Sequence, residues 1–224
     1  MTRHPLPNTG FLAHASPELT DVLNALATQI DLRAGQVLFE QGDDGDALFA
    51  ILSGSLEFSV LSMDGRKLAL DVMKAGALFG EIALFDPGVR TATATATEAS
   101  RVCRIKNADV LKAIRTAPDL GIDLIRLAGQ RMRWMNSQLH EQVFLPMPTR
   151  LARKILYLTL DTSDKPDTLA LSQAELAEFV GATREAVSKA LATWKRSGIV
   201  ESSRGGLKVL DRLALQTAAD LDQI

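Results

Sequence analysis

The spacing of apolar residues changes after about position 30 of the chain. Before it, Ser16 and Pro17 are typical of a helix N-cap and first turn, and they precede apolar residues that share one helical face. From 30 to 105, short apolar and β-branched runs are separated by glycines, and the Asp64-Gly65 pair is typical of a hairpin turn. The pattern predicts a short helix followed by an antiparallel β-roll or barrel.

A long helical pattern follows this predicted roll. Asn107 is predicted to cap a helix that ends near Arg115, and Pro118 to open a longer one that runs to about Leu145. Apolar and small residues at alternating spacings of four and three form the seam of a two-stranded coiled coil: Gly121, Ile125, Ala128, Met132, Met135, Leu139 and Gln142. We expect this seam to join two copies of the chain. A second stripe should pack on the roll: Leu120, Leu124, Leu127 and Trp134.

Two prolines, Pro146 and Pro148, interrupt the helical pattern and predict a domain boundary or hinge. Residues 150–160 predict a helix, and 161–167 predict a polar loop. The rest of the chain therefore forms a separate C-terminal part.

The C-terminal part carries the pattern of a helix-turn-helix. Ser172 and Glu175 form a capping box at the start of one helix, and Gly181 ends it. Thr183 caps a second, basic helix that ends at Gly198. Two short helices about a glycine turn are typical of DNA-binding proteins. The apolar runs on either side of 204–206 predict a β-wing, and 211–224 predict a final helix.

The composition, with 46% hydrophobic and 23% charged residues in 224, is that of an ordinary globular chain of one or two domains. Because no apolar run reaches the ~20 residues of a membrane span and no signal peptide is evident, we expect no membrane association and a cytoplasmic location. Cys103 is the only cysteine, which excludes an internal disulfide and a metal or iron-sulfur site held by several thiolates of one chain. We expect Cys103 to be a small buried residue and expect no metal site.

Charge is unevenly distributed although the net charge is only -2. Residues 31–98 contain 11 acidic and 5 basic side chains, whereas residues 183–208 contain 2 acidic and 6 basic ones. A basic C-terminal segment on an acidic body favours contact with DNA through one face.

Chemistry suited to phosphate binding is concentrated in residues 79–92, here called the cassette. A guanidinium such as Arg90 offers paired donors to phosphate oxygens, and backbone amides near Gly80 and Ala83 can form an anion-binding concavity. A carboxylate such as Glu81 can accept a hydrogen bond from a ribose hydroxyl. On spacing alone, a surface strand-loop-strand with an incidental ion pair explains the segment equally well.

The cassette sequences FGEIAL and RTA resemble the phosphate-binding cassette of the cyclic-AMP receptor protein and fumarate-nitrate regulator family of bacterial transcription factors. The resemblance covers nearly the whole chain, including the glycine pattern, the long helix, the helix-turn-helix VGATREAVSKAL and the wing. It implies an α+β protein with a cyclic-nucleotide-binding, jelly-roll-like β-roll at 1–118, a dimerisation helix at 119–145 and a winged helix-turn-helix at 146–224.

The resemblance also implies ligand-binding roles. Arg90 and Thr91 would hold the cyclic phosphate, Glu81 would accept from the ribose 2'-hydroxyl, and the cassette would be lined by Gly80, Ile82 and Ala83.

The positions that meet the base in the family's nucleotide sensors depart from the family pattern here. Two consecutive hydroxyl residues are replaced by Met135 and Asn136, of which only Asn136 can hydrogen-bond a purine edge. The identity of the base is therefore open. Because a threonine after the cassette arginine, here Thr91, also occurs in cyclic-GMP binders, the expected ligand is cyclic AMP or cyclic GMP, with no other cofactor.

For DNA, the resemblance places base-reading positions on the second helix of the helix-turn-helix: Arg184, Glu185, Ser188 and Lys189. Arg184 can donate twice to guanine, and Glu185 can accept from cytosine N4. Phosphate contacts are expected from Gln173, Thr183, Lys195 and Arg204. The expected partners are a palindromic double-stranded operator, a second copy of the chain, and RNA polymerase.

Two alternatives remain open at this point. A regulator of the same fold could sense haem-bound gas or another metabolite, with His140 as a candidate haem ligand, although a solvated surface histidine explains it more simply. An enzyme with an appended nucleotide-binding module is disfavoured, because no paired acid-base or nucleophile motif is found.

Overall fold

A computed structural model describes residues 5–7, 10–65, 67–159, 167–203 and 206–220 of the chain. They belong to two compact units, one made of residues 1–61 and 70–134 and the other of residues 62–69 and 135–224. The division falls within the longest helix, and the expected three-part division stays a prediction. Each unit is described by itself.

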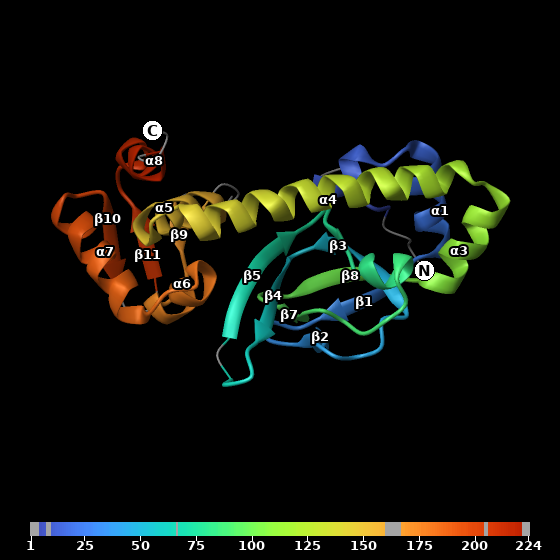
Figure 1. Ribbon diagram of the computed structural model, residues 1–224, viewed down its shortest axis with the longest axis horizontal. Helices are drawn as coiled ribbons and strands as arrows, with labels where there is room; N and C mark the ends of the chain where they lie inside the picture. Colours follow the sequence, from blue (N-terminus) through green and yellow to red (C-terminus); the bar gives the residue numbers. More distant parts are fainter. Residues whose placement is uncertain (1–4, 8–9, 66, 160–166, 204–205, 221–224) are drawn as a thin grey trace. The chain divides into compact units, whose positions relative to one another are not determined.

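The first unit contains two antiparallel four-stranded sheets, with strand orders β1-β8-β3-β6 and β2-β7-β4-β5 (Figure 1). Gly65, with φ +78°, turns the chain between β4 and β5 as the Asp-Gly pair predicts. The predicted β-roll is confirmed. Its strands are β1 (Thr28–Leu32), β2 (Val37–Phe39), β3 (Ala47–Ser53), β4 (Ser55–Leu61), β5 (Lys67–Lys74), β6 (Leu78–Phe79), β7 (Thr93–Ala96) and β8 (Ser100–Lys106). Residues 67–69, at the start of β5, are grouped with the second unit.

Strand β3 is buried on both faces, and the alternation of its side chains separates two hydrophobic clusters. Phe49 and Ile51 belong to a cluster with residues of both sheets, which forms the interior of the roll. Leu48 and Ala50 belong to a second cluster, together with apolar side chains of η1 and of the helices α1 to α4, whose bounds follow below. One sheet therefore has the roll interior on one face and helices on the other.

The helices of the first unit pack on this second cluster (Figure 1). The unit contains the 3-10 helix η1 (Gly10–His14) and the helices α1 (Pro17–Leu26), α2 (Ile82–Phe85), α3 (Asn107–Thr116) and the first part of α4 (Asp119–Phe144). Ser16 caps α1 as predicted, because its hydroxyl accepts from the Leu19 amide at 3.1 Å. The prediction for Asn107 was wrong. Lys106 is the N-cap of α3, and Asn107 is its first helical residue.

The two stripes of α4 differ in burial. Leu120, Leu124 and Leu127 are buried in the second cluster, as the sequence predicts. Trp134, the fourth residue of this stripe, is partly exposed and lies outside the cluster. The predicted seam is exposed for most of its length, with large apolar side chains in water. Its two ends have other neighbours: a Cβ at Gly121 would lie 3.2 Å from Ile114 of α3, and the Gln142 amide donates to the Val180 carbonyl.

The second unit contains the predicted helix-turn-helix and wing. Its elements beyond the end of α4 are α5 (Met147–Leu158), β9 (Thr168–Leu169), α6 (Gln173–Val180), α7 (Arg184–Arg196), β10 (Val200–Ser203), β11 (Gly206–Val209) and α8 (Arg212–Asp220). Helix α5 begins earlier than expected, with Pro146 as its N-cap and Pro148 in its first turn. All but Asp167 of the predicted polar loop lies outside the described residues.

The C-terminal helix α8 packs on α5 through buried Leu215 and Ala219. Arg153 of α5 donates to the Ala219 carbonyl at 2.9 Å and pairs with Glu141 of α4 at 3.1 Å. Helix α8 thus covers part of α5. No helix in the described ranges is long and apolar enough to cross a membrane.

Candidate functional site

Arg90 lies at the centre of the cassette with only 5% of its surface exposed. Its guanidinium lies over the rings of Phe39 and Phe49, at 4.5 and 5.2 Å from their centroids. Nη2 donates to the Ala47 carbonyl at 2.7 Å, and Nη1 lies against Gly80, where a Cβ would be only 2.8 Å away. Only glycine leaves this space, and its φ of +81° also favours glycine.

Two donors of this guanidinium are left for a ligand. Nε and Nη1 are buried and have no hydrogen-bond partner among the residues that the structure describes. A buried donor without a partner is destabilising by about 1 to 3 kcal/mol, and by more when it is charged. Arg90 therefore fits a group that supplies anionic acceptor oxygens.

The charge of Arg90 is only partly balanced by the protein. Burial lowers the pKa of the Arg90 guanidinium, and the Asp46 carboxylate, 4.0 Å away, opposes this shift. Arginine nevertheless stays protonated at neutral pH. Asp46 also pairs with Arg104, so its one negative charge is divided between two arginines. An anion bound at Arg90 would supply the missing countercharge.

The cassette helix α2 brings backbone amides to the same segment. Glu81 is in the αR conformation and is the N-cap of α2. The backbone amides of Ile82 and Ala83, in the first turn, therefore have no carbonyl acceptor within the helix. Such amides favour anions. The Glu81 side chain makes no capping hydrogen bond and is partly exposed, which leaves its carboxylate oxygens available as acceptors.

A loop that the sequence interpretation did not single out forms the other flank of Arg90. The Arg90 amide donates to the Asp43 carbonyl at 2.7 Å, and the Gly45 amide donates to the Gly88 carbonyl at 3.0 Å. A Cβ at Gly45 would lie 2.4 Å from that of Ala83, so glycine permits the loop to touch α2. The segment GDDGD before β3 offered a signal, since a glycine between acidic residues is typical of a tight turn.

The structure brings most predicted ligand residues together. Gly80, Glu81, Ile82, Ala83, Arg90 and Thr91 all lie in the first unit around the start of α2 and the end of the cassette. Ile82 and Thr91 are exposed, whereas Ala83 is buried. Asn136 is exposed on the part of α4 that belongs to the other unit, so its contact with a base stays a prediction.

Helix α7 is held by its buried face and by caps at its start. Val187, Leu191 and Trp194 are buried on its inner face. The Thr183 hydroxyl accepts from the Ala186 amide at 3.2 Å, and Gly181, with φ +60°, makes the turn from α6. The Ser172–Glu175 capping box is also present. These local features orient the outer face of α7.

Most of the predicted DNA-contacting side chains are solvent-accessible. Thr183, Arg184, Glu185, Lys189 and Lys195 are exposed, and Ser188 and Gln173 are partly exposed. Arg204, at the tip of the predicted wing, lies outside the described residues. Three of the exposed residues are cationic and on one helix, which fits an anionic polymer.

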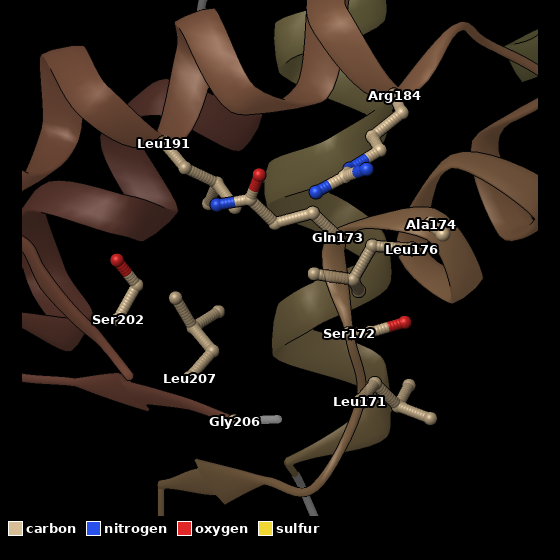
Figure 2. A pocket seen from close by; sticks show the side chains of 10 residues that line it. All are labelled: Leu171, Ser172, Gln173, Ala174, Leu176, Arg184, Leu191, Ser202, Gly206 and Leu207. Atoms are coloured by element: carbon tan, nitrogen blue, oxygen red, sulfur yellow. The ribbon is translucent and has the colours of Figure 1, made fainter. Parts of the chain in front are cut away.

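A cavity of about 430 Å³ lies between α6, α7 and the wing. Gln173 and Arg184 line it together with apolar Leu176, Leu191 and Leu207, and the Gln173 amide is directed toward Leu191 (Figure 2). Two residues predicted to contact DNA, Gln173 of α6 and Arg184 of α7, therefore line the same cavity.

Two other residues considered from the sequence have simple environments. His140 is exposed and its ring lies 4.7 Å from that of Phe144. Cys103 is buried in the second cluster, as predicted, and burial raises the pKa of its thiol. Across the described ranges, no group of three or more His, Cys, Asp or Glu side chains could hold a metal ion.

Comparison with known proteins assigns both parts of the chain to families. Residues 29–117 match the Cyclic nucleotide-binding domain family, and residues 149–218 match the Crp-like helix-turn-helix domain family. The chain is 31% identical, over 198 residues, to a CRP-like cAMP-activated global transcriptional regulator of Mycobacterium tuberculosis, covering 86% of this chain and 88% of that one. It is 30% identical to the cyclic AMP receptor protein of Thermus thermophilus, over 83% and 85% of the two chains.

Solved structures share the fold. A c-di-GMP-responsive global regulator of Xanthomonas campestris matches with a TM-score of 0.75 and 20% identity, over 87% of this chain and 99% of that one. A CRP/FNR-family transcriptional regulator of Thermus thermophilus matches with a TM-score of 0.74 and 24% identity, over 86% and 98%. The predicted fold class, a cyclic-nucleotide-binding roll with a long helix and a C-terminal helix-turn-helix, is confirmed.

Proposed function

Because the chain belongs to the CRP/FNR family of transcription regulators, we propose that cyclic AMP binds at the Arg90 cassette and controls sequence-specific DNA binding by a homodimer. The observation that carries the proposal is the pair of buried Arg90 donors without partners among the described residues. A cyclic phosphate has two anionic exocyclic oxygens, which can accept from these donors. The exposed hydroxyl of Thr91, the next residue, is proposed as a further donor to the phosphate.

The remaining cassette residues suit the sugar-phosphate part of the same ligand. The amides of Ile82 and Ala83 at the first turn of α2 can donate to phosphate oxygens, and Gly80 lets the chain approach them closely. The Glu81 carboxylate can accept from the ribose 2'-hydroxyl. The ligand would thus join α2 and Arg90 through contacts that the free protein lacks.

Cyclic AMP is proposed over cyclic GMP because the two relatives at 30–31% identity are named for cyclic AMP. Asn136 can both donate to and accept from an adenine edge, which is compatible with this choice. The structural neighbour that responds to c-di-GMP makes a larger nucleotide the principal competitor.

The effect on DNA follows from linkage. We expect the ligand to bind more tightly to the conformation that fits DNA. The factor by which the ligand raises the affinity for DNA then equals the factor by which DNA raises the affinity for the ligand. Arg184, Glu185, Ser188 and Lys189 would contact bases, and Gln173, Thr183, Lys195 and Arg204 would contact phosphates. RNA polymerase is the proposed protein partner, and no catalytic step is proposed.

Calorimetric titration of the full-length protein with cyclic AMP, cyclic GMP and c-di-GMP tests the proposal. The variant Arg90→Met puts an unbranched apolar side chain beside Phe39 in place of the guanidinium and so removes the charge and the donors. Arg101→Met is its matched control, because it removes the same charge from β8, where Arg101 pairs with Asp31.

We expect Arg90→Met to weaken cyclic AMP binding at least about 100-fold, since two hydrogen bonds to a charged group contribute about 3 kcal/mol or more. Arg101→Met should bind as the wild type does. Undiminished affinity in Arg90→Met would remove the cassette from the proposal, and preferential binding of c-di-GMP by the wild type would replace cyclic AMP.

A further inference from the structure

Asn107 joins three segments of the first unit although it is not one of the predicted ligand residues. It is the first residue of α3 and only 9% exposed. Its Nδ2 donates to the Gly45 carbonyl and to the Ala83 carbonyl, both at 3.1 Å, and its backbone amide donates to the Asp46 carbonyl at 3.0 Å. One side chain thus holds a loop and the cassette helix α2 together.

The orientation of the Asn107 carboxamide follows from its neighbours. If the carboxamide were flipped, Oδ1 would face two carbonyl oxygens, and neither of them can donate a hydrogen bond. The observed orientation leaves Oδ1 buried and without a hydrogen-bond partner within the described part of the chain. Asn107 thus makes two hydrogen bonds through Nδ2 while its Oδ1 stays buried without one. Buried polar side chains are normally fully hydrogen-bonded, so this arrangement is unusual for a residue that only fills space.

The two carbonyls belong to the segments that hold Arg90. Two residues beyond Gly45, the Ala47 carbonyl accepts from Arg90 Nη2, and three residues before Ala83, Gly80 lies against Nη1. The spacing of these segments therefore sets the width of the space that the guanidinium occupies. Gly45 and Ala83 are so close that a Cβ on Gly45 would lie 2.4 Å from that of Ala83. The hydrogen bonds of the Asn107 amide therefore hold the loop and α2 at a distance that no larger side chain could fill.

We propose that Asn107 is a positioning residue for the cyclic phosphate: its amide clamps the Gly45 loop to α2 and so fixes Arg90 and the first amides of α2 relative to one another. This inference rests on the proposed function. Because Asn107 begins α3 and α2 contributes Leu84 to the same cluster as α3 and α4, the clamp also ties the cassette to the helices behind it.

The test uses the full-length protein and the variants Asn107→Ala and Asn107→Asp. Alanine removes both donations. Aspartate keeps the size of the side chain but directs carboxylate oxygens at two carbonyls. The matched control is Asp109→Asn, which exchanges carboxylate and amide at an exposed position in the same turn of α3.

Two quantities are measured below the melting temperature of each variant. The first is the Kd for cyclic AMP. The second is the ratio of the Kd values for the two phosphorothioate diastereomers of cyclic AMP, in which sulfur replaces one or the other exocyclic oxygen. The ratio reports how the phosphate is placed and does not change when a variant is merely less stable.

We expect Asn107→Ala to raise the Kd for cyclic AMP about tenfold or more and to move the diastereomer ratio toward one, with a larger effect in Asn107→Asp and none in Asp109→Asn. If Asn107→Asp does not fold, Asn107→Ala decides. An unchanged diastereomer ratio in Asn107→Ala overturns the inference even if its Kd rises, because Asn107 is then only structural. A wild type that binds no cyclic nucleotide overturns the proposed function and the clamp together.

Discussion

Replacing Met132 with glutamate should dissociate the dimer that we expect the α4 seam to form. The seam exposes four large apolar side chains, Ile125, Met132, Met135 and Leu139, with 50 to 65% of their surface in water. Full burial of such a side chain contributes about 1.5 to 3 kcal/mol, so covering the exposed part contributes about 1 to 2 kcal/mol each. The eight side chains of two copies then contribute about 8 to 16 kcal/mol, against an association cost of about 4 to 15 kcal/mol.

This balance leaves a dimer that one substitution can break. Met132→Glu removes about 1 to 2 kcal/mol of burial from each copy. It also brings two carboxylates to facing positions of the seam, where desolvation and repulsion add several kcal/mol. A total of about 4 kcal/mol or more corresponds to a dissociation constant that is about 1,000-fold higher.

Sedimentation equilibrium or light scattering over a concentration series measures this constant directly. The matched control is Ser137→Glu, which adds the same charge on the side of α4 opposite the seam and should leave the dimer intact. A monomeric wild type at micromolar concentration, or a Met132→Glu variant that dimerises as tightly as Ser137→Glu, would refute the reasoning.

Further predictions concern DNA and the buried thiol. Arg184→Ala should weaken specific binding by ~1 to 3 kcal/mol and relax the preference at one guanine, as measured by site selection from random DNA at one salt concentration. The selected consensus should be two-fold symmetric with half-site centres about 34 Å apart, and an asymmetric consensus would contradict the dimeric readout. Lys195→Ala should weaken binding to all sequences alike and lower the salt slope by about one, whereas a change of consensus would show that Lys195 contacts bases. Because burial raises the pKa of Cys103, the unfolded chain loses its thiol proton first, and the free energy of unfolding should fall as the pH rises above about 8.5. Urea titrations should show that Cys103→Ala lacks this part of the decline, and identical pH profiles would contradict it.

The sequence by itself determined the features that depend on neighbouring residues. The Ser16 cap, the Ser172–Glu175 capping box and the turn at Gly181 are formed by side chains and amides within a few positions of one another. The burial of Leu120, Leu124 and Leu127 followed from helical periodicity, and the fold class followed from the order of these elements together with the family resemblance. Local hydrogen bonds and periodicity can be read from spacing, because they are satisfied within one element.

Only the tertiary structure decided what surrounds the cassette. Asn107 had the sequence signature of a helix cap, yet its amide donates to carbonyls 62 and 24 positions away, at Gly45 and Ala83. The packing of Arg90, in the loop before β7, on Phe39 of β2 and Phe49 of β3 likewise joins segments that lie far apart in the chain. A buried amide or guanidinium takes whichever acceptors the fold brings near it, and that choice depends on the pairing of distant strands. Spacing along the chain carries no information about this pairing.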